Sequence, residues 1–125
     1  MIFFSVFQVN ANSFENVTLT CSTDKFPIKG GFIFTNSQKV ERYNIMLNHK
    51  TNQEFIKKTE HCYSLSDHFI AISDESLENG CGGYSSFIDI NTLEFSRPIE
   101  NIVLTAQCTY SEKDLIQVLK KAINN

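Results

Sequence analysis

The feature that most constrains the fold of this chain is a regular succession of short strand-like segments and turns. Residues 17–21 alternate apolar and polar side chains with a period of two, which is typical of a half-buried strand. Similar segments, separated by polar or glycine-containing turns, recur about every eight to twelve residues as far as Tyr110. This spacing predicts a mainly β fold, either an antiparallel β-sandwich or a small β-barrel.

The C-terminal segment changes from the strand period to a helical one. Leu115 and Leu119 lie on one apolar stripe at helical spacing. Ser111, followed by Asp114 three places on, is close to a capping box. We therefore predict one amphipathic helix at about 112–123, with its apolar stripe packed on the sheet.

The chain has the length of one ordinary domain, 125 residues, and we expect a single β-rich domain over 13–125. Residues 1–12 contain a short apolar run, and Val9 and Ala11 have the small-residue spacing of an export-signal cleavage site. The run is short and lacks a basic start. Two interpretations therefore stay open, the truncated remnant of an export signal and an edge strand.

The four cysteines, Cys21, Cys62, Cys81 and Cys108, are even in number and contain no CxxC pair. Disulfides require an oxidising compartment, so this pattern favours a secreted or periplasmic protein. Three connectivities are open. If the strand ending at Cys21 lies beside the last strand, Cys21 and Cys108 pair and Cys62 and Cys81 close a short loop. The alternative is four buried free thiols.

Charge and motifs exclude several classes of function. The net charge is −3, with 11 basic and 14 acidic residues and no basic stripe, so we predict no nucleic-acid partner. No apolar run approaches the about 20 residues of a transmembrane helix. His61 and Cys62 are adjacent and so point to opposite faces of a strand. We predict no metal site, no cofactor and no catalytic residue.

A binding surface is predicted instead at the acidic, glycine-containing loop from Asp74 to Gly83. Asp74, Glu75 and Glu78 supply negative charge, and Tyr84 follows as an aromatic contact residue. Loops on rigid sheets commonly carry binding function. The expected partner is a basic protein.

Cys21 and Cys108 near the ends of the β-rich part, and Gly82-Gly83-Tyr84 in a loop before a strand, resemble the small periplasmic lysozyme-inhibitor proteins. The resemblance implies a compact β-barrel that acts by binding. The chain departs from that family because it lacks tryptophan and has a predicted helix after the last cysteine. The resemblance therefore identifies no individual site residue.

We expect an exported protein-binding module, an inhibitor or immunity-type protein acting on a cationic partner. One alternative is a small hydrolase that uses His68 with Asp67, or a thiol-dependent enzyme that uses a free Cys62. Another alternative is a structural component of the cell envelope. The sequence predicts no oligomeric state.

Overall fold

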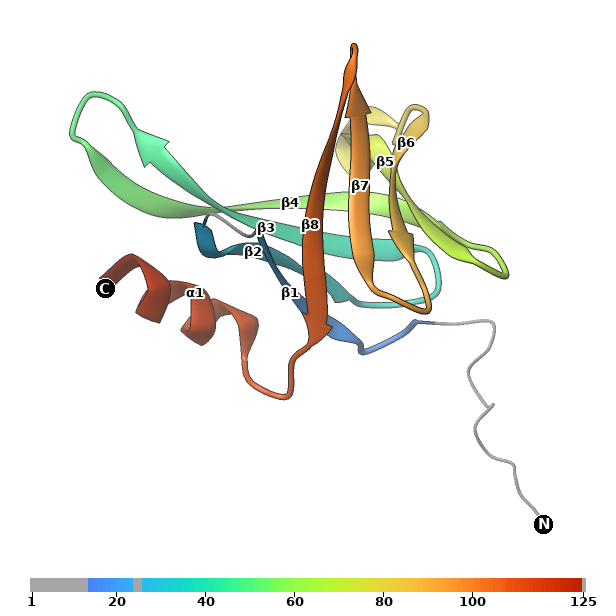
Figure 1. Ribbon diagram of the computed structural model, residues 1–125, viewed down its shortest axis with the longest axis horizontal. Coiled ribbons are helices and arrows are strands. Elements are labelled where there is room, and N and C mark those ends of the chain that lie inside the picture. The colour runs from blue at the N-terminus through green and yellow to red at the C-terminus, as the bar shows by residue number, and fades with distance from the viewer. Residues whose placement is uncertain (1–13, 24–25, 125) are drawn as a thin grey trace.

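The computed structural model describes residues 14–23 and 26–124, so the predicted signal remnant or edge strand at 1–12 lies outside the described residues. The described residues form eight strands, a short 3-10 turn and a C-terminal helix (Figure 1). The elements, in chain order, are β1 (Thr18–Thr23), β2 (Phe26–Phe34), β3 (Lys39–Asn48), β4 (Gln53–Leu65), β5 (Phe69–Ser76), the 3-10 turn (Leu77–Asn79), β6 (Tyr84–Asp89), β7 (Glu94–Ile99), β8 (Ile102–Tyr110) and α1 (Leu115–Asn124).

The strands close into an antiparallel up-and-down barrel in which each strand pairs with its sequence neighbours. Closure comes from the pairing of the first strand with the last, in a register that sets Leu19 opposite Tyr110 and Cys21 opposite Cys108. A closed barrel leaves no unpaired strand edge to aggregate. The predicted mainly β fold with a C-terminal helix is confirmed, in its barrel form.

One end of the barrel is closed by aromatic side chains. Phe34 makes edge-to-face contacts with Phe14 and Tyr63, with ring centroids 5.2 Å and 4.8 Å apart. The Tyr63 hydroxyl donates a 2.6 Å hydrogen bond to the carbonyl of Asn36 in the β2–β3 turn. All three aromatic residues are buried, so this end of the barrel is filled by side chains.

The helix α1 packs on the outside of the barrel wall and does not enter the barrel. Leu115 and Leu119 are fully buried against Tyr43. The wall is flat there because Gly31 has no side chain: a Cβ at Gly31 would lie 2.8 Å from Leu115 Cδ1 and closer still to the carbonyl oxygen of Leu19. A glycine at this position is thus required by the close approach of the helix.

The helix begins at Leu115, three residues later than the predicted start at 112. The N-cap is Asp114, whose Oδ1 accepts a 2.9 Å hydrogen bond from the amide of Ile116. Ser111 instead accepts a hydrogen bond from the amide of Lys113 in the turn before the helix. The sequence predicts a polar cap in this segment, but the capping residue is Asp114 and not Ser111, three residues earlier.

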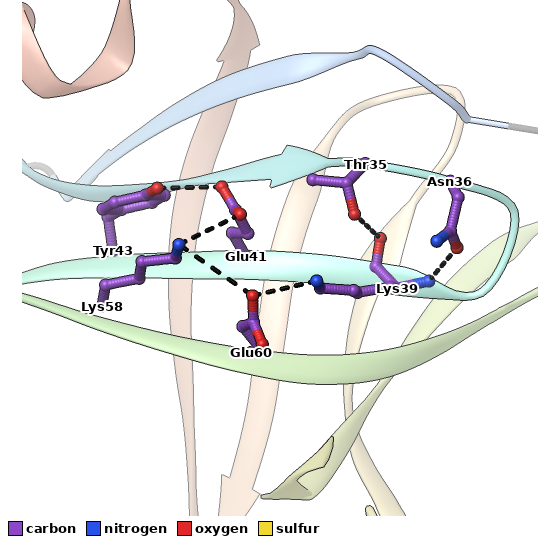
Figure 2. A network of polar contacts seen from close by, with 7 residues as sticks. All are labelled: Thr35, Asn36, Lys39, Glu41, Tyr43, Lys58 and Glu60. Carbon is purple, nitrogen blue, oxygen red and sulfur yellow. Dashed lines mark hydrogen bonds and ion pairs between the residues drawn. The ribbon is translucent and has the colours of Figure 1, made fainter. Parts of the chain in front are cut away.

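The outer face of the β3–β4 hairpin carries a ladder of alternating charges (Figure 2). Lys58 Nζ lies 3.2 Å from Glu41 and 3.9 Å from Glu60, and Lys39 Nζ lies 2.9 Å from Glu60. The Tyr43 hydroxyl donates a 2.9 Å hydrogen bond to Glu41. Burial and then the Glu41 carboxylate raise the pKa of Tyr43 to about 12. All these charges are paired, which indicates a structural ladder.

Candidate functional site: a cationic barrel mouth

The cysteines form two disulfides, Cys21–Cys108 and Cys62–Cys81, which selects one of the three open connectivities. The first joins two directly opposed residues of β1 and β8 and so locks the barrel seam. The second ties β4 to the segment that follows the 3-10 turn. The Cys62 sulfur is therefore bonded, and a thiol nucleophile at this position would first require reduction.

The predicted acidic loop is tightly braced. The strand β5 continues through Asp74 to Ser76, and the Asp74 amide donates a 2.8 Å hydrogen bond to the carbonyl of Gly83. One oxygen of the Asp74 carboxylate accepts hydrogen bonds from the amide and hydroxyl of Ser85. Asp74 is thus occupied in holding the loop closed.

The remaining predicted contact residues of this loop face solvent. Glu75 and Glu78 are exposed, and Tyr84 lies exposed at the start of β6. Leu77, in the 3-10 turn between them, is also exposed. The structure brings these four side chains onto one braced connection.

The other end of the barrel, which we call the mouth, is where the β3–β4, β5–β6 and β7–β8 hairpins turn. The long β3–β4 and β7–β8 hairpins project beyond the barrel body here (Figure 1). A cavity of about 130 Å³ opens between the β1–β3 wall and the β7–β8 wall. Its lining residues include Cys21, Gly30, Phe32, Arg42, Asn44 and Phe95.

Arg42 brings a positive charge into this cavity. It follows Val40, which is fully buried in the core, by two residues and so lies on the same inward face of β3. Its guanidinium carbon lies 5.8 Å from the ring centroid of Phe32 and 5.7 Å from that of Phe95. Because the two rings are themselves 5.9 Å apart, the guanidinium caps both ring faces in two cation–π contacts.

Lys29 also lines the cavity, but it is ion-paired with Glu54 at 3.2 Å. Arg97, the only other arginine in the chain, does not line the cavity itself but lies near enough for its charge to act on Arg42. It lies two residues after Phe95 on β7 and therefore on the same inward face. Among the described residues, neither guanidinium forms an ion pair or a hydrogen bond with a carboxylate. Burial, and then the charge of Arg97, lower the pKa of Arg42.

His61 lies deeper on the same side of the barrel. It pairs with Val40 across β3 and β4, and its Nδ1 lies 3.0 Å from the Ser73 carbonyl while its Nε2 lies 2.8 Å from the Thr59 hydroxyl. A neutral imidazole satisfies both contacts. Burial first, and the charges of Arg42 and Arg97 next, lower the pKa of His61. The hydrogen bond to the Ser73 carbonyl opposes this shift only in part, so the surroundings disfavour a positive charge on this imidazole.

The sequence does not by itself predict this arginine-containing cavity. The only sequence signal for this site is the spacing of the two arginines. Arg42 follows the apolar Val40 by two positions, and Arg97 follows the apolar Phe95 by two positions. That pattern marks a shared face. It does not reveal that the two faces meet, because β3 and β7 are brought together only by barrel closure.

The other candidate groups do not assemble into a site. Asp67 and His68 are exposed in the β4–β5 turn, at the closed end of the barrel. In the described part of the chain, no three His, Cys, Asp or Glu side chains gather to hold a metal ion. No helix among these residues is long and apolar enough to cross a membrane.

Fold and site together define a disulfide-bonded, closed antiparallel β-barrel with a cavity at its mouth that is lined by aromatic rings and by Arg42. The chain matches no protein-family model, no curated protein and no solved structure.

Proposed function

We propose that the protein is a non-catalytic binding protein that takes an anionic ligand into the mouth of its barrel. The observation that carries this proposal is the Arg42 guanidinium, which lies over Phe32 and Phe95 at the cavity without a carboxylate partner among the described residues. A partly buried cation without an anion is costly, and an arginine fork matches a carboxylate bidentately. A ligand carboxylate would supply the missing partner.

The experiment is an NMR titration with benzoate, whose ring suits the aromatic wall and whose carboxylate suits the guanidiniums. Because the chain has only two arginines, its ¹H–¹⁵N spectrum has only two arginine Nε–H resonances. We expect both to shift with benzoate and neither to shift with neutral benzyl alcohol.

Arg42→Met tests the assignment, and Lys58→Met on the outer face is its matched control. We expect Arg42→Met to weaken benzoate binding by at least tenfold, because a charged hydrogen-bond pair is worth about 1.5–3 kcal/mol. Lys58→Met leaves binding unchanged. Benzoate binding that is equal in wild type and Arg42→Met would refute the proposal.

A second candidate function is the binding of a basic protein through the braced loop, which would make the protein the inhibitor or immunity-type module predicted above. The observation that favours it is the exposure of two large apolar side chains, Leu77 and Tyr84, on a connection tied by a disulfide. Tyrosine in particular is enriched at protein interfaces. Replacing Glu75 and Glu78 by Gln should weaken capture of a basic partner; unchanged capture would reject this candidate.

The compartment belongs to the same proposal. Export to the periplasm or the cell exterior would keep the two disulfides oxidised. In the cytosol the same cysteines would be kept reduced. The test is the intact mass of the natively expressed protein after thiol alkylation without reductant. We expect no alkylated cysteine; four alkylated cysteines would contradict export.

A further inference from the structure

The β7–β8 hairpin carries an apolar ladder that leads outward from the cationic mouth. Leu104 lies directly opposite Arg97, and the next inward-facing pair towards the hairpin tip is Ile99 with Ile102. Paired residues lie on the same face of a sheet. These three apolar residues, which we call the apolar ladder, therefore continue the face that bears Phe95 and Arg97.

No described part of the chain covers the ladder. Leu104 is 47% exposed and Ile102 is 59% exposed. The hairpin that carries them projects from the barrel body (Figure 1). Large apolar side chains held in a row next to a polar site mark a binding surface more often than a chance exposure.

The dimensions of cavity and ladder indicate what the ligand looks like. The cavity of about 130 Å³ is smaller than the about 300–1,000 Å³ of a site that encloses a whole small molecule. It has room for a head group, and the rest of a larger ligand must lie outside. From Ala106 to Ile102 the strand β8 extends about 13 Å at about 3.3 Å per residue, and its inward positions Ala106, Leu104 and Ile102 provide a linear apolar track.

We infer that the ligand is an anionic amphiphile, a long-chain carboxylate whose head group binds Arg42 and Arg97 and whose alkyl chain lies along the apolar ladder. This inference rests on the proposed function, because it specifies the ligand of the same site. Charge complementarity selects the head group, and the one-sided apolar track selects an unbranched tail.

The test is isothermal titration calorimetry of the full chain with hexanoate, octanoate, decanoate and decanol below their micelle concentrations. We expect the Kd to fall about twofold for each added methylene, about half of the full burial effect, because one side of the chain stays in water. We expect decanol to bind at least tenfold more weakly than decanoate, because it cannot pair with a guanidinium.

Two variants of neighbouring residues locate the tail. Leu104→Thr removes an apolar side chain from the ladder, and Val103→Thr removes one from the opposite face of the same strand, where Val103 is 59% exposed. We expect Leu104→Thr to weaken decanoate binding about fivefold and Val103→Thr to leave it unchanged. Both replacements are mild, because Thr suits an exposed strand position.

The outcomes separate this inference from the proposed function. Equal affinity for hexanoate and decanoate, with benzoate binding still dependent on Arg42, would overturn the amphiphile and leave the anion site intact. Decanoate binding that is unchanged in Leu104→Thr, or equally weakened in Val103→Thr, would likewise remove the tail from the ladder. Decanol binding as tight as decanoate would overturn the head-group assignment.

Discussion

Replacing Arg42 by Met should stabilise the free protein while it weakens anion binding by at least tenfold. The guanidinium lies partly buried on the inward face of β3 without a carboxylate partner among the described residues. Taking an unpaired charge out of water costs several kcal/mol in real proteins. An arginine that serves binding is therefore expected to weaken the free fold.

The magnitude follows from two opposing effects. Met loses two cation–π contacts, with Phe32 and Phe95, which are worth about 0.5–1 kcal/mol each. It also removes the desolvation of a charge that Arg97 further repels, and because the mouth is open to water we take this gain as about 2–4 kcal/mol. The unbranched Met side chain packs on the two rings in its place. The difference spans about 0–3 kcal/mol, and we expect a gain near its centre, about 1.5 kcal/mol, in the free energy of unfolding.

The assay is urea unfolding followed by circular dichroism, with the disulfides intact. A gain of this size raises the midpoint by about 1 M at an unchanged slope. Lys58→Met is the control, because Lys58 is exposed and its ion pair with Glu41 is worth less than about 1 kcal/mol. If Arg42→Met instead lowers the free energy of unfolding by more than about 1 kcal/mol, the guanidinium is a structural element and the reasoning for a binding site fails.

Three further predictions concern the fold. Replacing Cys21 and Cys108 by Ala should lower the free energy of unfolding by about 4–5 kcal/mol, because their disulfide spans 87 residues. Urea unfolding measures this loss of stability. A loss below about 1 kcal/mol would contradict the view that the disulfide stabilises the fold by restricting the unfolded chain. Because the pKa of His61 is lowered in the folded state, the unfolded chain takes up that proton first, and stability should fall as the pH drops below about 6.5. Urea midpoints at about pH 7.5 and 5.5 should therefore differ less in His61→Gln than in wild type, and equal differences would count against burial as the cause. In a tyrosinate absorbance titration, Tyr43 of the wild type should ionise near pH 12, and Tyr43 of Glu41→Gln should ionise at a lower pH. Ionisation of the wild-type Tyr43 near pH 10 would show that its hydroxyl is not buried.

The sequence predicts the strands well because each depends on local alternation. Residues 17–21 alternate as predicted, and in the structure Leu19 and Cys21 of this segment pack with the barrel core. Whether the strands form a sandwich or a barrel depends on the pairing of β1 with β8, which are far apart in the chain. Local periodicity cannot determine this pairing, and the only sequence clue to it was the potential bridge between Cys21 and Cys108.

The mouth was missed for a related reason. In β3 the apolar face that carries Tyr43 and Ile45 looks like the core face, but it lies under α1 on the outside of the barrel. The mixed face with Val40 and Arg42 is the one that lines the interior. A strand that is covered on both sides cannot be oriented by hydrophobicity alone.

The charge of the ligand follows from the inward-facing residues, and the net charge of the chain does not predict it. Glu41 and Arg42 are neighbours in the sequence, and their opposite charges cancel in the net charge. In a strand, however, neighbouring side chains point to opposite faces. Glu41 joins the outer charge ladder with Lys58 and Tyr43, so its charge is neutralised there. The charge of Arg42 stays inside, next to aromatic rings and near Arg97. A chain of net charge −3 thus encloses a positively charged site, and an anion that enters it pairs with guanidiniums that water solvates only in part. For this reason we expect selection for anions to persist at salt concentrations that screen the acidic residues outside.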